Sequence, residues 1–172
     1  MKPKSEPVWT KGPSTRFIIH HTAGHHPELG DAANESVAES IAYAKAIQRL
    51  HMLVNGWNDS GHNFLVCRNG WVLQGRWRTV TAIQHQRMVV SAHCPSQNTQ
   101  VGIEHEHVGT EPLTERQFEA SCRLQAWVCR CYGLNETLDT RGHREFFSTA
   151  CPANLQETIP EMIARVNALL SV

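Results

Sequence analysis

The sequence lacks the features that mark a polyanion-binding, secreted or membrane-spanning chain. Its 16 lysines and arginines are balanced by 16 acidic residues, which excludes the broad positive surface used to collect nucleic acid or anionic lipid. Apolar runs are short, and the N-terminus has no apolar core of a signal peptide. The 172 residues are therefore predicted to form one compact domain that binds neither nucleic acid nor membrane.

The first 15 residues carry prolines at Pro3, Pro7 and Pro13 among lysine, serine and glycine. Such a composition favours extended chain over packed structure. We expect a leader or linker at 1–15 and a single domain at 16–172.

Cysteine is too sparse for a disulfide framework, because the chain has six and no CxxC pair. Most of them are interpreted as small buried or half-buried thiols. Histidine is abundant instead, with eleven residues. Since histidine is the commonest metal ligand and titrates closest to neutral pH, its positions are the first place to look for chemistry.

Strand-like and helix-like segments alternate along the chain, which predicts an α/β domain with a mixed central sheet flanked by helices. Asn69-Gly70 is a strong hairpin signal, Thr114 and Gln117 form a candidate capping box, and Pro160 suits the first turn of a helix. We expect strands at 16–21 and 99–109, a hairpin at 63–76, and helices at 35–54, 114–132 and 159–170.

The stretch GHREFFSTACP (142–152) places His143 eight positions before Cys151 among turn-forming residues. A catalytic zinc ion takes three protein ligands from imidazole, thiolate or carboxylate groups and leaves a fourth position for water. A histidine at a strand end, together with His143 and Cys151, would meet that count. On spacing alone, a histidine and a cysteine eight apart are more often unrelated surface and core residues.

Four stretches of the sequence follow one another in an order known from one enzyme family. They are FIIHHTAG (17–24), IQRLHMLVNGWNDSGHNFLVCRNGWVLQGR (47–76), SAHCPSQNTQVGIEHEH (91–107) and GHREFFSTACP (142–152). Together they resemble the zinc-dependent N-acetylmuramoyl-L-alanine amidases, the family that includes amidase-type phage lysozymes and peptidoglycan recognition proteins. The resemblance runs from about Arg16 to Leu155.

The resemblance implies one zinc ion held by His20, His143 and Cys151. Adjacent residues of a strand point to opposite faces, so His20 and His21 cannot both reach the same metal, and we expect His20. The alternative role of His21 is a packed or hydrogen-bonded neighbour. The following loop is expected to carry two rim residues, His25 and His26.

The implied reaction is hydrolysis of the amide between N-acetylmuramic acid and L-alanine. Water must be activated and a tetrahedral oxyanion stabilised, and zinc does both, lowering the pKa of bound water to about 7. The resemblance implies Glu104 as the base that takes the water's proton and passes it to the leaving amine. The alternative is a half-exposed strand glutamate without a catalytic role.

The chain departs from the family pattern at His62, where many members have a tyrosine assigned to orienting the water or stabilising the oxyanion. An imidazole can donate a hydrogen bond or shuttle a proton, so we expect a catalytic role with stronger pH dependence near neutrality. The alternative is a strand-end histidine without contact to the water. Thr149 matches a family threonine or lysine and could contact the oxyanion, or it could be a turn residue.

The resemblance also implies substrate contacts from His93 and Asn98, which match positions beside the groove for the stem peptide. Trp57 and Trp71 could be groove walls or packing residues, and packing is favoured for both, as it is for His51. The substrate partner is therefore peptidoglycan, bound by a monomer.

The leading interpretation is the catalytic domain of a phage endolysin or bacterial autolysin. The missing signal would suit release from the host through a holin, or excision from a longer protein. Two other classes stay open. A recognition module would bind the stem peptide without cutting it, as family members that lack the cysteine ligand do. A structural zinc protein would need a fourth protein ligand, for which His62 or Glu104 would be candidates.

Overall fold

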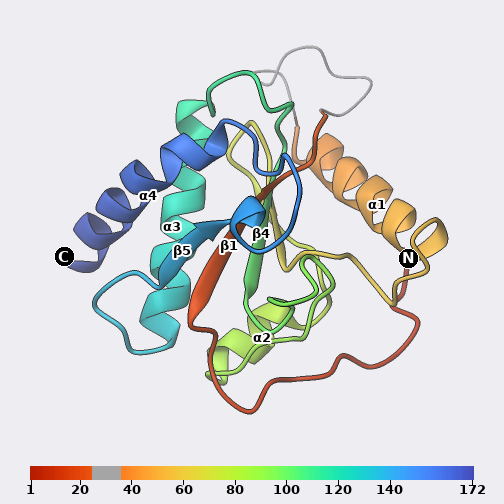
Figure 1. Ribbon diagram of the computed structural model, residues 1–172. Helices are drawn as coiled ribbons and strands as arrows, with labels where there is room; N and C mark the ends of the chain where they lie inside the picture. The colour runs from red at the N-terminus through yellow and green to blue at the C-terminus, as the bar shows by residue number, and fades with distance from the viewer. Residues whose placement is uncertain (25–35) are drawn as a thin grey trace.

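The computed structural model in Figure 1 describes residues 1–24 and 36–172, so His25 and His26 lie outside the described residues. Strands and helices alternate along the chain as predicted. Their order is β1 (Arg16–His21), α1 (Val37–Leu53), β2 (Phe64–Val66), β3 (Val72–Gln74), α2 (Thr79–Gln84), β4 (Val101–His105), α3 (Glu115–Cys131), β5 (Asp139–Gly142), the 3-10 turn η2 (His143–Glu145) and α4 (Leu155–Leu170).

The strands form one five-stranded sheet in the order β3-β2-β4-β1-β5. Three neighbouring pairs are parallel and only β2 and β3 are antiparallel, which confirms the predicted mixed sheet. In the register of the two central strands, His20 pairs with Glu104. Directly paired residues project from the same face of a sheet, so these two side chains lie on one side.

Helices cover both faces of the sheet, α3 and α4 on one side and α1 on the other (Figure 1). Phe17 and Ile19 of β1 point into the main apolar core, which residues of α3 and α4 complete. On the other face, Leu65 of β2 packs with Tyr43 of α1 in a smaller cluster. The alternation along β1 therefore directs Ile19 into the main core and His20 to the α1 side.

Two helix starts follow the expected capping chemistry, and one prediction about them is wrong. Ser36 caps α1, with its Oγ accepting from the Glu39 N–H at 3.3 Å and the Glu39 carboxylate accepting from the Ser36 N–H. The Thr114 Oγ caps α3 by accepting from the Gln117 N–H at 3.1 Å. The Gln117 side chain, however, does not close a capping box; it donates to the carbonyls of Val66 and Glu106, because it is buried against the sheet.

The last helix is longer than predicted. It begins at Leu155, so Pro160 lies inside the helix and not in its first turn. A proline there removes one backbone hydrogen bond, which favoured the later start. Burial of Leu155, Ile159 and Met162 on one face offsets that loss and extends the helix by a turn.

Strand β5 and helix α2 were not predicted. The β5 sequence, Asp-Thr-Arg-Gly, carries little strand signal, and only Thr140 and Gly142 are buried. It forms because it pairs in parallel with β1 from Arg16 to Ile19. This pairing decides where the residues after Gly142 lie.

The N-terminal segment lies along the domain surface and makes specific contacts with it. The Lys4 ammonium donates to the Met52 carbonyl at 2.7 Å, and the Thr10 N–H donates to the Met88 carbonyl at 2.7 Å. Trp9 forms an isolated antiparallel bridge with Val89. No helix among residues 1–24 and 36–172 has the length and apolar character needed to cross a bilayer.

Candidate metal centre and active site

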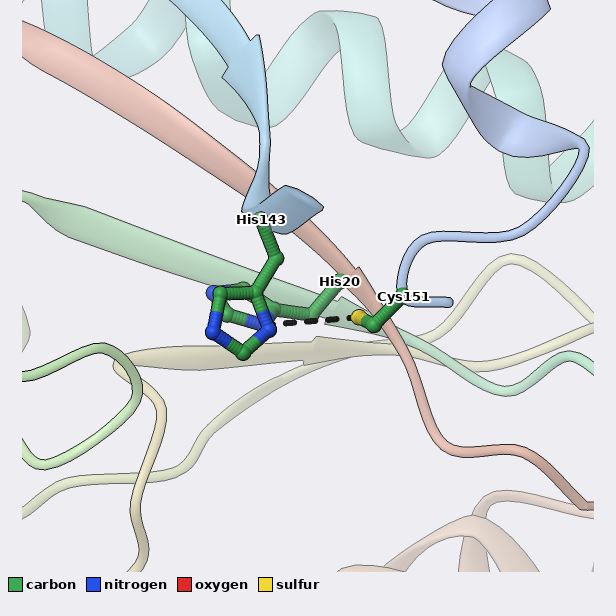
Figure 2. A group of neighbouring side chains, drawn as sticks. All are labelled: His20, His143 and Cys151. Carbon is green, nitrogen blue, oxygen red and sulfur yellow. Dashed lines mark hydrogen bonds between the residues drawn. The ribbon is translucent and has the colours of Figure 1, made fainter. Parts of the chain in front are cut away.

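Three side chains from two distant parts of the sequence converge where β1 and β5 end. His20 is near the end of β1, His143 follows β5 directly, and Cys151 lies in the loop before α4. Their possible ligand atoms all lie within 4.8 Å of one another. Figure 2 shows the three side chains turned toward one another. The parallel pairing of β1 with β5 explains the meeting, because it places both strand ends at the same edge.

Two imidazoles and one thiolate make a donor set suited to zinc. Among the residues that the structure describes, no fourth histidine, cysteine or carboxylate joins His20, His143 and Cys151 in this group. Catalytic zinc sites have three protein ligands and a water molecule in the fourth position, whereas structural zinc sites have four protein ligands. The donor set therefore fits a metal ion that keeps one open position.

The protonation states of the cluster also suit a cation. Burial, reinforced by neighbouring histidines, holds the pKa of His20 well below its ordinary value, so the imidazole is neutral at pH 7. Burial also lowers the pKa of His143. Burial raises the pKa of Cys151 to about 12, so the thiol gives up its proton at neutral pH only when a positive charge compensates the thiolate.

An acid–base pair, with His62 buried and Glu104 half-buried, lies beside the cluster on the same face of the sheet. His62 Nδ1 is 2.5 Å from Glu104 Oε2, with the side chains 1% and 17% exposed. Burial alone would raise the pKa of Glu104, but the charge and hydrogen bond of His62 outweigh it and the net shift is downward. Glu104 is thus ionised at neutral pH. Gly75 makes room for His62, since a Cβ there would lie 2.7 Å from the imidazole Cδ2.

The cluster and the acid–base pair open into one pocket of about 440 Å³. Thr149 is on its rim, with its Oγ1 accepting from the Cys151 N–H at 3.2 Å. The pocket is lined by His20, His21, Ala23, His51, Trp57, Gly61, His62, His93, Glu104, His143, Thr149, Ala150 and Cys151.

The two candidate substrate contacts lie in different surroundings. His93 lines the pocket, and its Nδ1 is 2.9 Å from His20 Nε2. Asn98 is not among the lining residues within the described part of the chain. Its Oδ1 accepts from the Cys94 N–H at 2.9 Å, so the side chain shapes the loop that carries His93.

Two pocket residues, and one aromatic neighbour of the metal cluster, carried too little sequence signal to be assigned there. His51 and Trp57, interpreted as packing residues, face each other with ring centroids 4.8 Å apart on the pocket wall. Their position just before His62 in the chain was the available clue. Phe147 stacks on His143 with centroids 5.7 Å apart and stays 52% exposed. An exposed aromatic residue in a loop has no periodic pattern that could reveal its partner.

The family model described as N-acetylmuramoyl-L-alanine amidase matches residues 10–154. The chain belongs to this family. It is 32% identical over 138 residues to peptidoglycan-recognition protein SC2 of Drosophila simulans, covering 78% of this chain and 66% of that protein. It is 28% identical over 164 residues to human N-acetylmuramoyl-L-alanine amidase, covering 87% of this chain and 25% of that protein.

The fold of the family is confirmed by solved structures. Peptidoglycan recognition protein LE, solved with tracheal cytotoxin, a monomeric diaminopimelic acid-type peptidoglycan, matches with a TM-score of 0.77 and 25% identity. The match covers 94% of this chain and 87% of that chain. This chain spans just under two thirds of the length of its Drosophila simulans relative.

Proposed function

We propose that this member of the amidase family hydrolyses the amide between N-acetylmuramic acid and the L-alanine of the peptidoglycan stem peptide, with one zinc ion held by His20, His143 and Cys151. The observation that carries the proposal is the joint placement of this cluster and the Glu104–His62 pair in one pocket. A metal cluster alone would be compatible with a protein that only binds the stem peptide. A carboxylate base beside it suits hydrolysis.

Zinc bound at the cluster would supply Lewis acidity, bringing the pKa of water to about 7 and polarising the amide carbonyl. Glu104 accepts the proton of the attacking water and returns it to the amide nitrogen as the C–N bond breaks. His62 holds the carboxylate in place through the Nδ1 contact. The products are the muramyl carboxylate and a peptide with a free L-alanine amino group. The oxygen of the water is then in the carboxylate, and one of its hydrogens is on the new amino group.

Thr149 is positioned to help at the oxyanion. A hydroxyl group has one donor and can accept as well. The Thr149 oxygen already accepts the Cys151 N–H, so its own O–H remains to donate into the pocket. A donor directed at the developing oxyanion lowers the barrier because charge builds up there only in the transition state.

The experiment is incubation of the zinc-loaded chain with purified muropeptides, followed by mass spectrometry. We expect release of stem peptide with a new L-alanine amino terminus. A Cys151→Ala variant and a chelator-treated sample serve as matched controls, and both should leave the muropeptide intact. Product in either control would contradict the assignment of the cluster.

The second candidate is a recognition module that binds the stem peptide without cutting it. It is favoured by the histidine at position 62, where many family members carry the tyrosine implied in catalysis, and by the peptidoglycan fragment bound to protein LE. Intact muropeptides that bind the zinc-loaded chain in the same assay would establish this alternative.

For the amidase, we further propose that it acts at the bacterial cell wall as a monomer, as the catalytic domain of an endolysin or autolysin. Lysis of wall preparations by the purified chain, with its mass determined in solution, tests this setting separately from the chemistry.

A further inference from the structure

A chain of hydrogen bonds runs from the protein backbone through His93 to His20. His93 Nε2 is 3.2 Å from the Gln100 carbonyl oxygen, and His93 Nδ1 is 2.9 Å from His20 Nε2. The two rings meet edge to face, with an interplanar angle of 80°. His93 therefore contacts a proposed metal ligand directly, a role different from the substrate contact that its sequence position implies.

The direction of these bonds determines which nitrogen of each ring carries hydrogen. The Gln100 carbonyl can only accept, so His93 Nε2 must donate to it. In a neutral imidazole the other nitrogen then accepts, which makes His93 Nδ1 the acceptor for His20 Nε2–H. The free lone pair of His20 is consequently on Nδ1.

That lone pair faces the cluster. His20 Nδ1 lies 3.7 Å from Cys151 Sγ, the contact drawn as a dashed line in Figure 2. A metal-ligating histidine ordinarily donates its second N–H to an acceptor that fixes its tautomer and ring orientation. Here His93 is that acceptor.

The sheet is built to leave space for the His93 ring. Gly102, the second residue of β4, lies beneath it, and a Cβ at that position would be 2.4 Å from His93 Cδ2. That distance is far shorter than van der Waals contact, and the ring could not keep its place. A glycine in a strand interior often marks such a close approach.

We propose that His93 is a positioning residue that holds His20 as an Nδ1 metal ligand, with Gly102 providing the space for its ring. This inference rests on the proposed zinc function. It assigns His93 a measurable effect on metal affinity, which a residue that only contacts substrate would not have. Loss of such a partner typically weakens metal binding about 10- to 100-fold.

The test compares two substitutions of similar size in the full chain, His93→Leu and His93→Asn. The Asn side-chain oxygen stands close to where Nδ1 was and can accept from His20, whereas Leu cannot. We expect Leu to weaken zinc binding about 10- to 100-fold in chelator competition and Asn to recover most of that loss. Gly102→Ala should resemble Leu, because it displaces the ring. Thermal unfolding of each variant checks that the fold is kept.

A second readout needs neither zinc nor activity. Nitrogen-15 NMR of the metal-free chain should show His20 protonated at Nε2 and not at Nδ1. Protonation at Nδ1 would overturn the proposal. So would unchanged zinc affinity in His93→Leu with a raised KM for muropeptides, the result expected of a substrate contact.

Failure of the proposal and failure of the proposed function can be told apart. Zinc binding that depends on His93, without any hydrolysis, would overturn the amidase and leave the positioning role standing. A wild-type chain that binds no zinc at this cluster would overturn both.

Discussion

Two buried histidines on neighbouring strands make contacts of different kinds. His105 of β4 faces the α3 side, where Nδ1 is 3.0 Å from the His20 carbonyl and Nε2 is 2.8 Å from Ser121 Oγ. His20 of β1 faces the pocket and uses one nitrogen for His93, while the other faces Cys151. Burial therefore does not distinguish a ligand from a structural histidine. What distinguishes them is a ring nitrogen directed at other donor atoms.

The same contrast separates the two faces of the sheet. The α3 and α4 side is closed by apolar packing around Phe17 and Ile19. The opposite side carries the pocket that Glu104 and six histidines line, a polar arrangement that contributes less to stability than apolar burial would. Apolar packing on the α3 and α4 side of the sheet therefore contributes most of the stability of the fold, and the α1 side carries the proposed catalytic groups.

The largest effect should come from exchanging the two adjacent histidines of β1 for alanine one at a time. His20→Ala is expected to remove zinc binding and reduce muropeptide hydrolysis to background, because a ligand is lost. His21→Ala should retain zinc, since the hydrogen bond of His21 to Cys151 Sγ, at 3.4 Å, comes from the backbone N–H, which alanine keeps. Isothermal titration with zinc measures both. Loss of zinc in His21→Ala with retention in His20→Ala would reverse the assignment.

Glu104→Gln tests the acid–base part of the pocket without changing its shape. We expect kcat to fall about 10²- to 10⁴-fold, because an amide side chain cannot accept the water's proton. Zinc affinity should stay near the wild-type value, since Glu104 is outside the three-residue cluster. Steady-state kinetics on muropeptides and zinc titration together give the result. Wild-type kcat in this variant would exclude Glu104 as the base.

His62 distinguishes this chain from many family members, and two substitutions examine it. His62→Phe should lower kcat roughly 10- to 100-fold, because a hydrogen bond to a charged group contributes about 1.5–3 kcal/mol. His62→Tyr offers a hydroxyl donor and should recover part of that loss. Steady-state kinetics on muropeptides measures kcat for both variants, and equal kcat for His62→Phe and the wild type would remove His62 from the mechanism.

Much of the fold was predictable because it follows local rules. The strand at 16–21 was predicted with its observed bounds, and the hairpin and the Thr114 cap follow from short-range turn and capping chemistry. Strand β5 was not, because its four residues form a strand only by pairing with β1. Local propensity carries no information about such a partner.

For the site, the resemblance implied which residues to examine, and the structure brings His20, His143 and Cys151 together. The contact between His20 and His93 was beyond the sequence. It depends on the tautomers of both rings and on the space above Gly102, and the spacing of residues along the chain predicts neither of them. His93 lies in the loop between α2 and β4, so its contact with a residue of β1 follows from the tertiary structure and not from a local pattern.

The smallest effect on the reaction should come from His105, which is buried like His20 but has no ring nitrogen facing the cluster. His105→Leu should leave zinc affinity and kcat unchanged but lower the free energy of unfolding by about 1–3 kcal/mol, since buried polar partners lose their bonds. Burial lowers the pKa of His105 to about 4, against 6.5 when exposed. The unfolded chain therefore binds more protons between these values.

The sign of the pH effect follows from that difference. The contribution of neutral His105 to stability is complete above pH 6.5 and is lost progressively as the pH falls toward 4, by up to about 3 kcal/mol for one fully buried group. Urea denaturation of wild type and His105→Leu at several pH values measures it. The wild-type curve should fall more steeply than the variant's over this range. Parallel curves would mean that His105 is not held neutral by the fold, and the two histidines would then differ in position only.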